Sequence, residues 1–184
     1  MRIGIVILSY NRREALARTL AHVSTLGANR ITVVDNASTD GTVEMVQREF
    51  PAVETLPLPA NIGVAAFNRG VAATPCDAVL ILDDDAWPEA ETFATAVAAM
   101  QADASLGAVA LLPTHPVTGE IEWPVPDGPR DDWPILGCGN LIRTEAWNAT
   151  GGYEESFFLY RNDADLALKL LSAGWKVRCD PTLI

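Results

Sequence analysis

Residues 78–85 read Ala-Val-Leu-Ile-Leu-Asp-Asp-Asp, an apolar run that ends abruptly in three aspartates. A run without polar alternation is typical of a strand covered on both faces, as in parallel sheets. Side chains alternate along an extended segment, so we expect Asp83 and Asp85 to point together while Asp84 turns aside. Three adjacent carboxylates repel one another, so something must compensate their charge. A converging pair suits a hard divalent cation completed by substrate phosphates, whereas the alternative is a solvated turn that caps a helix.

Strand-like and helical patterns alternate on both sides of this run, which predicts an α/β domain with a mostly parallel sheet flanked by helices. The expected strands are 2–8, 31–34, 53–56, 78–82, 106–112, 135–143 and 175–179, and the expected helices run from 11 to 23, 41 to 50, within 61–70, 88 to 101 and 163 to 173. Asn11 is expected to cap the first helix, and Pro88 to lie in the first turn of the helix after the aspartates. Ligands of open α/β sheets bind at the carboxyl ends of the strands.

Length and composition limit the class of protein. The 184 residues are an ordinary size for one domain, and 13 basic against 24 acidic residues give a net charge of −11. Such a charge disfavours broad nucleic-acid binding. Apolar runs stay well below the roughly 20 residues that span a bilayer, and the start lacks the features of a signal peptide. We expect a cytoplasmic protein, with contact at the inner face of a membrane left open.

Two other strand ends carry polar motifs that the same edge would bring together. Ser9-Tyr10-Asn11 follows the first expected strand, and Asp35 and Asn36 begin a turn that runs to Gly41. An aromatic face with an Asp-Asn pair could stack on a nucleobase and hydrogen-bond its edge. Taken separately, each motif favours ordinary capping chemistry over base binding.

The order of these motifs resembles that of the family-2, inverting glycosyltransferases, which have the GT-A fold. The motifs are Ile-Val-Ile-Leu-Ser-Tyr-Asn at 5–11, Val-Val-Asp-Asn-Ala-Ser-Thr-Asp-Gly at 33–41, Asn-Ile-Gly at 61–63, Asn-Arg-Gly at 68–70 and the aspartates at 83–85. The resemblance covers nearly the whole chain and is strongest to the rhamnosyltransferase-type branch. It implies one GT-A domain over 1–184, with a nucleotide-sugar-binding half at 1–112 and an acceptor and catalytic-base half at 113–184.

The resemblance also implies roles for single residues. Tyr10 would pack on the base, Asp35 and Asn36 would bond the base and its surroundings, and Asp83 and Asp85 would hold Mg²⁺ or Mn²⁺ as the Asp-x-Asp pair. The full set implied to bind the nucleotide sugar is Ser9, Tyr10, Asn11, Asp35, Asn36, Asn61, Gly63, Asn68, Arg69, Asp83 and Asp84.

Residues 151–166 are similar to the family stretch that ends in Glu-Asp-x-Asp-Leu. Asp163 matches its catalytic base, and Asn162 stands where the family often has Glu. The start of a helix favours an ionised carboxylate, as a general base requires, although Asp163 could instead be only an N-terminal helix charge. On the acceptor side the resemblance implies Gly137, Cys138, Gly139 and Tyr160, with Cys138 expected to be a small filler rather than a nucleophile.

The proline-rich insert at 113–134 is expected to form a loop or hairpin with a turn at 118–119. Trp123 and Trp133 within it could stack on an acceptor or pin the loop to the core, and we favour the second role. His22 and His115 match no metal or triad spacing and are expected to be surface or capping residues.

One departure from the family concerns the metal. Family members commonly place a metal-binding His shortly after the strand that corresponds to 175–179, and this sequence ends at Ile184 before reaching it. Either the chain is a truncated domain of a longer protein, or carboxylates and diphosphate hold the metal alone.

The resulting expectation is transfer of a sugar, with rhamnose as the candidate, from a UDP- or dTDP-sugar to a hydroxyl of a glycan, lipid-linked or other acceptor, with inversion. A nucleotidyltransferase could also use paired aspartates and magnesium, but the glycines expected after the first strand are missing at 9–13. A truncated or inactive relative that only binds nucleotide sugar, or acts in an assembly, is the third alternative. The oligomeric state stays open.

Overall fold

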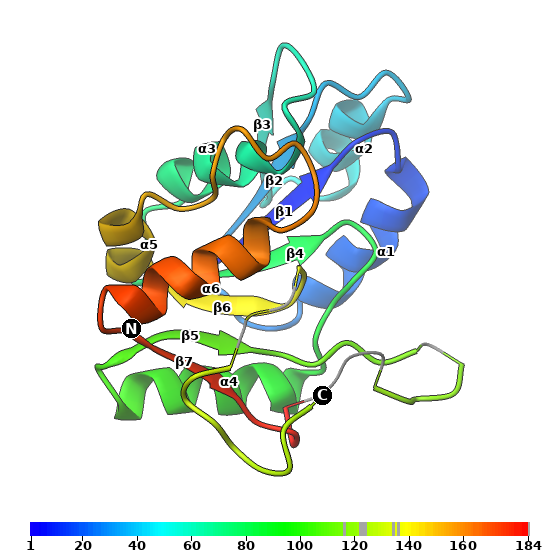
Figure 1. Ribbon diagram of the computed structural model, residues 1–184. Coiled ribbons are helices and arrows are strands. Elements are labelled where there is room, and N and C mark those ends of the chain that lie inside the picture. The colour runs from blue at the N-terminus through cyan, green and yellow to red at the C-terminus, as the bar shows by residue number, and fades with distance from the viewer. Residues whose placement is uncertain (116, 122–124, 134, 136, 184) are drawn as a thin grey trace.

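A computed structural model describes the chain except for residues 116, 122–124, 134, 136 and 184. Within the described residues, seven strands form one sheet in the order β3-β2-β1-β4-β6-β5-β7 (Figure 1). The strands are β1 (Ile3–Ser9), β2 (Arg30–Asp35), β3 (Glu54–Pro57), β4 (Ala78–Asp83), β5 (Leu106–Ala110), β6 (Asn140–Arg143) and β7 (Lys176–Cys179). All run parallel except β6, which lies antiparallel between β4 and β5. The prediction of a mostly parallel sheet is therefore confirmed.

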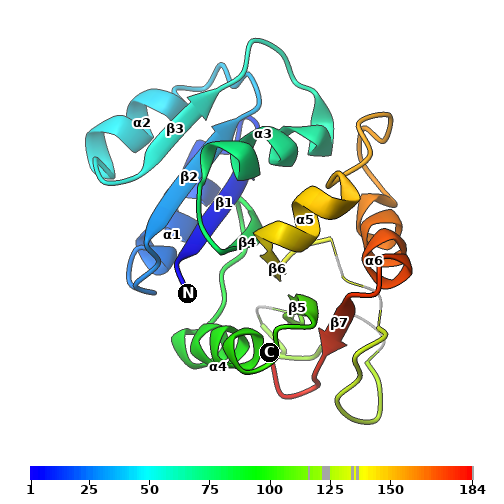
Figure 2. The same ribbon diagram turned by 90° about the vertical axis from the view of Figure 1, so that its left-hand side faces the viewer.

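Helices cover both faces of this sheet (Figures 1 and 2). They are α1 (Arg13–Val23), α2 (Thr42–Glu49), α3 (Ala66–Ala73), α4 (Ala90–Ala102), α5 (Thr144–Thr150) and α6 (Asn162–Ser172), with a short 3₁₀ turn, η1, at Gly63–Ala65. The alternation along β1 separates two cores, because Ile5 and Ile7 pack toward α1, α2 and α4 whereas Val6 packs toward α3, α5 and α6. Among the described residues, no helix is long and apolar enough to cross a membrane.

The register places the polar motifs side by side. Ser9 at the end of β1 lies opposite Asp35 at the end of β2, and Leu8 lies opposite Asp83 at the end of β4. Parallel pairing therefore gathers the three strand ends at one edge of the sheet, as the sequence predicts.

Three local expectations are wrong. The α1 helix begins at Arg13 rather than being capped by Asn11, which takes a positive φ of 54° and turns its side chain to another loop. Pro88 precedes the first residue of α4 by two positions, so it lies outside that helix. The strand expected from 135 covers only 140–143, and Gly139 just before it has a φ of +76° that ends extended structure.

The insert is partly a hairpin. Thr114 and Ile121 form an antiparallel bridge around Gly119, whose φ is +71°. Trp133 packs against a small cluster that includes buried Cys179, which favours the expected pinning role, and Trp123 lies outside the described residues. His115 accepts hydrogen bonds from two backbone N–H groups of the turn through Nδ1, at 3.3 and 3.2 Å, as a capping residue does.

Candidate active site

The acidic triplet lies at the carboxyl end of β4 and divides as the alternation predicts. Asp84 is only 5% exposed, and its carboxylate accepts a hydrogen bond from Ser9 Oγ at 2.9 Å. Thr19 Oγ1 also donates to the main-chain carbonyl of Asp84 at 2.9 Å, so the middle residue is fixed from two sides. Asp83 and Asp85 are both exposed at the sheet edge.

The charges of the triplet act on one another. Loss of solvent around the carboxylate, followed by the charges of Asp85 and Asp84, raises the pKa of Asp83 to about 6. Burial also raises the pKa of Asp84, although its hydrogen bond from Ser9 and the charge of Arg12 oppose that change. The site therefore favours any partner that brings positive charge.

Arg12 supplies the compensating charge that the sequence requires. Its Nη2 lies 2.7 Å from Asp85 Oδ2, and its Nε lies 3.3 Å from Asp84 Oδ1. Sequence reasoning missed this residue, although a cation placed directly after the strand-end motif at 9–11 had to lie at the same edge.

Asp83 and Asp85 have the chemistry of ligands for a hard divalent cation. Two carboxylates, however, supply only some of the ligands that such an ion needs. Both are exposed carboxylates, and the Asp85 charge acts on Asp83 strongly enough to shift its pKa. Over the described ranges, however, no group of three or more His, Cys, Asp or Glu side chains is arranged to hold a metal ion. Since Mg²⁺ keeps about six oxygen ligands, substrate phosphates and water would have to supply the others.

Tyr10 and Asp35, the residues expected to contact a nucleobase, lie at the ends of β1 and β2. Tyr10 is 47% exposed. Asp35 is 2% exposed, and its Oδ2 accepts the Ser38 N–H at 3.0 Å. Its Oδ1 is buried without a hydrogen-bond partner among the described residues, which leaves an acceptor for a donor group from a ligand.

Several predicted nucleotide residues use their polar groups inside the protein instead. Asn11 Oδ1 accepts the Thr39 N–H at 2.7 Å, and Ser9 is committed to Asp84. The Asn68 side chain exchanges two hydrogen bonds with the backbone of Tyr153, at 2.8 and 3.0 Å. These contacts tie neighbouring loops together and shape the sheet edge.

Arg69 and the 61–63 segment complete the predicted nucleotide set. Arg69 is exposed and forms an ion pair with Glu155 at 3.4 Å. Asn61 Oδ1 accepts the Gly63 N–H at 2.9 Å, and Gly63 itself is buried against the carbonyl of Phe158.

Asp163 is the second residue of α6, and Arg161, which directly precedes the helix, has a φ of 68°. It is half-buried, and its Oδ2 is 3.9 Å from the position that a Cβ would take at Gly137. The next residue, Cys138, accepts the Asp83 N–H through Sγ at 3.4 Å. Residues 137 and 138 therefore connect the surroundings of Asp163 with those of Asp83.

A buried tyrosine links the same two carboxylates. Burial raises the pKa of the Tyr153 hydroxyl, and the charges of Asp163 and then Asp83 raise it further. Tyr153 is 1% exposed and lies among the residues that pack under α5 and α6. Both carboxylates thus act on one buried hydroxyl, and sequence reasoning missed this residue as well.

The acceptor-side residues fall into two groups. Cys138 and Gly139 line a cavity of about 450 Å³ together with Asp85, Trp87 and Leu111. Burial raises the pKa of the Cys138 thiol, and the Asp83 charge adds to this, so the residue is a protonated filler as expected. Tyr160 lies apart from this cavity lining, 81% exposed and with a φ of 27°.

Residues 4–167 match the sequence profile of the family described as Glycosyl transferase family 2. The chain belongs to this family. The match runs from β1 into α6, so this glycosyltransferase family 2 chain has both the acidic triplet and Asp163 inside the matched region. The resemblance inferred from the motifs is confirmed.

Two curated relatives of this family 2 chain are named for rhamnose transfer and for succinoglycan biosynthesis. One is the N-acetylglucosaminyl-diphospho-decaprenol L-rhamnosyltransferase of Mycobacterium tuberculosis, with 26% identity over 93% of this chain and 71% of that protein. The other is the succinoglycan biosynthesis protein ExoA of Rhizobium meliloti, with 30% identity over 89% of this chain and 55% of that protein.

Solved structures show the GT-A fold for this chain. The mannosyltransferase PcManGT from Pyrobaculum calidifontis, in complex with GDP-Man and Mn²⁺, matches with a TM-score of 0.79 and 24% identity over 99% of this chain and 55% of that one. S. aureus TarS 1-349 in complex with UDP-GlcNAc matches with a TM-score of 0.78 and 16% identity over 97% and 55%. The family 2 chain thus spans about half the length of these solved structures.

Proposed function

We propose that this chain is the catalytic domain of an inverting, metal-dependent glycosyltransferase. It moves a sugar, with rhamnose as the first candidate, from a UDP- or dTDP-sugar to a hydroxyl acceptor. The observation that carries this proposal is the placement of Asp163 beside Gly137, with Cys138 hydrogen-bonded to the backbone of Asp83. Asp163, as a proton acceptor, is thereby grouped with Asp83 and Asp85, as candidate metal ligands, at the carboxyl ends of the parallel strands, where open α/β sheets bind their ligands.

The donor nucleotide binds with its base at the ends of β1 and β2. The exposed Tyr10 ring stacks on the base, and the unpartnered Asp35 Oδ1 accepts its N–H group. Uracil and thymine both carry such an imide donor, which supports the choice of UDP- and dTDP-sugars. Arg69, exposed beside its Glu155 partner, is the cation of the 61–70 segment that can turn toward the diphosphate.

Asp83 and Asp85 are the residues that would hold Mg²⁺ or Mn²⁺. When bound, the cation neutralises charge that develops on the departing diphosphate. Two observations support this choice: Asp83 and Asp85 are exposed carboxylates whose charges act on each other, and the structural neighbour PcManGT is in complex with Mn²⁺. Because such an ion takes about six oxygen ligands, the diphosphate and water would supply those that two carboxylates do not.

Asp163 acts as the general base. Its carboxylate takes the proton of the acceptor hydroxyl while that oxygen attacks the anomeric carbon from the face opposite the diphosphate, which inverts the configuration. Its position in the first turn of α6 places the carboxylate at the positive end of the helix dipole. The absence of a side chain at Gly137 leaves room for a sugar beside Asp163.

Residues 1–112 form the nucleotide-sugar half, and residues 113–184 form the acceptor and base half, with Gly137, Cys138, Gly139 and Tyr160 on the acceptor side. The two halves share one sheet, because β6 and β7 join β4 and β5. A lipid-linked acceptor and a role in cell-wall or polysaccharide synthesis follow by analogy with the mycobacterial relative.

A thermal-shift screen tests the donor assignment. The purified chain is heated with UDP, dTDP, GDP or ADP, each with and without Mn²⁺. We expect stabilisation by UDP or dTDP that depends on Mn²⁺, and at one hundred times the dissociation constant it should reach about 2.7 kcal/mol. Equal responses to all four nucleotides, or a response independent of Mn²⁺, would contradict the proposed donor site.

A further inference from the structure

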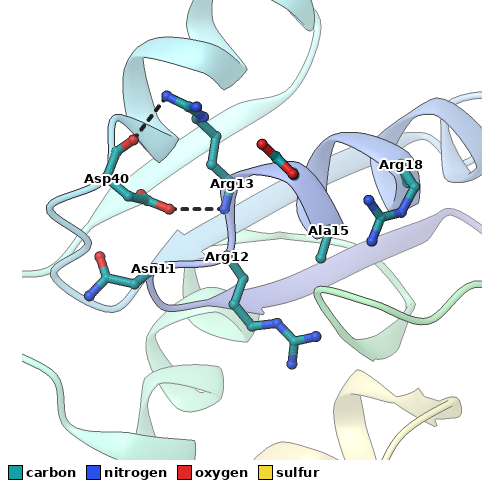
Figure 3. A pocket seen from close by; sticks show the side chains of 7 residues that line it. Asn11, Arg12, Arg13, Ala15, Arg18 and Asp40 are labelled. Atoms are coloured by element: carbon teal, nitrogen blue, oxygen red, sulfur yellow. Dashed lines mark hydrogen bonds between the residues drawn. The ribbon is translucent and has the colours of Figure 1, made fainter.

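Arg12 occupies a fixed position over the acidic triplet. The backbone on both sides of it is fastened to the loop after β2, because Asn11 N–H donates to Ser38 Oγ at 2.9 Å and Arg13 N–H donates to Asp40 Oδ2 at 3.0 Å. Figure 3 shows the result at a pocket of about 390 Å³: Arg13 turns toward Asp40, while Arg12 extends away from both. Arg12 is thereby directed to the carboxylates and not to the loop.

The two ends of this guanidinium contact partners of different kinds. Nη2 bonds to Asp85 Oδ2, which belongs to an exposed carboxylate, whereas Nε faces Asp84 Oδ1, which belongs to a buried one. A divalent cation on Asp85 must compete with Arg12, whose Nη2 lies 2.7 Å from Oδ2, because two positive charges on one carboxylate repel each other. Asp84 is not one of the proposed metal ligands, so Arg12 keeps its contact with Asp84 when a cation binds Asp85.

We propose that Arg12 couples metal binding to nucleotide binding by exchanging Asp85 for the diphosphate. In the metal-free protein Arg12 holds Asp85. When the cation takes Asp85, the released Nη2 donates to a phosphate oxygen, a partner that suits a guanidinium well. This inference rests on the proposed function, since it takes Asp83 and Asp85 as metal ligands and a nucleotide diphosphate as substrate.

The charges explain why each ligand alone binds weakly. A cation without nucleotide must displace Arg12 and leaves its Nη2 without an anion. A diphosphate without cation meets three carboxylates, of which Arg12 faces only two. Together the two ligands leave less unpaired charge than either leaves alone, and the coupling is reciprocal because each must strengthen the other by the same factor.

The test measures Mn²⁺ affinity from the electron paramagnetic resonance signal of free Mn²⁺, with and without UDP. The variants are Arg12→Gln, Arg12→Lys and the control Arg18→Gln, which removes the same charge from an exposed position in α1, the helix that follows Arg12. Without UDP, Arg12→Gln should bind Mn²⁺ about twofold to fivefold more tightly than wild type, since an ion pair has been removed from Asp85. The factor by which UDP strengthens Mn²⁺ binding should fall in this variant.

The controls separate the alternatives. Arg12→Lys keeps the charge but loses the guanidinium that contacts Asp84 and Asp85 at the same time, so its Mn²⁺ affinity should lie between those of Arg12→Gln and wild type. Arg18→Gln should behave as wild type. Unchanged affinity and unchanged coupling in both Arg12 variants would overturn the inference while leaving the metal site in place. If wild type binds no Mn²⁺ even with UDP, the proposed metal site fails, and the coupling through Arg12 fails with it.

Discussion

The side chains of Asn36 and Asn61 hydrogen-bond to each other at 2.8 Å, across 25 positions of the chain. Asn36 also accepts the Ile62 N–H at 2.9 Å and donates to the Gly63 carbonyl at 3.2 Å. It is buried, so a residue that the motif assigns to the surroundings of the base fastens the 61–63 segment to the end of β2.

This arrangement predicts that Asn36→Ala destabilises the protein. The substitution leaves buried donors and acceptors unpaired, so the free energy of unfolding should fall by about 1–3 kcal/mol in urea denaturation. The exposed Asn148→Ala should change it by less than about 0.5 kcal/mol. Wild-type stability with lost nucleotide binding would show instead that Asn36 contacts the base directly.

Gly63 predicts a second effect on stability, at the contact between η1 and the loop before α6. Its φ is +63°, and a Cβ there would overlap the carbonyl oxygen of Phe158, which accepts the Val64 N–H at 2.9 Å. Gly63→Ala should therefore lower the melting temperature and the free energy of unfolding by more than about 1 kcal/mol.

A matched control isolates the overlap from the backbone strain. Gly27 has a φ of +73° with nothing within 4 Å of an added Cβ, so Gly27→Ala carries the strain alone. Equal losses for the two variants would mean that the contact with Phe158 contributes nothing.

The sequence predicts the frame of the fold better than its local connections. Apolar runs such as 78–82 specify buried strands, and alternation correctly turns Asp84 inward. Asn11 escapes prediction because a tertiary bond to Thr39 replaces the local cap. Arg12 escapes for the same reason, since its partner Asp85 is 73 residues away and only the sheet register brings them together. The α5 helix is missed because its seven residues carry little periodic signal.

The raised pKa of Asp83 predicts a pH dependence for the metal-free protein. A carboxyl group with a pKa of about 6 in the folded state, above its usual 3.8, favours folding while protonated. That contribution is present below pH 4 and is lost as the pH rises to 6. Because Asp83→Asn lacks it, the stability of this variant relative to wild type should increase between pH 4 and pH 7.

Urea denaturation in the presence of a chelator measures this difference at several pH values. A difference between Asp83→Asn and wild type that stays constant from pH 4 to pH 7 would refute the raised pKa of Asp83.

The exposed ring of Tyr10 predicts an effect on binding and not on folding. Tyr10→Ala should weaken UDP or dTDP binding by about 1–3 kcal/mol in calorimetry, because base stacking is lost. Tyr10→Phe keeps the ring and should bind as wild type does. Equal affinity of the Ala and Phe variants would remove Tyr10 from the proposed base site.

The central claim is that Asp163 is the general base opposite a nucleotide held at Asp83 and Asp85. Its most direct test is release of dTDP from dTDP-rhamnose, or UDP from a UDP-sugar, by Asp163→Asn, measured beside nucleotide affinity in Mn²⁺. Asp165→Asn is the control, since Asp165 is paired with Lys169 at 2.6 Å one turn along the same helix.

We predict that Asp163→Asn lowers turnover by about 10²- to 10⁴-fold with unchanged nucleotide affinity, while Asp165→Asn retains most of the activity. Turnover by Asp163→Asn at the wild-type rate would contradict the account.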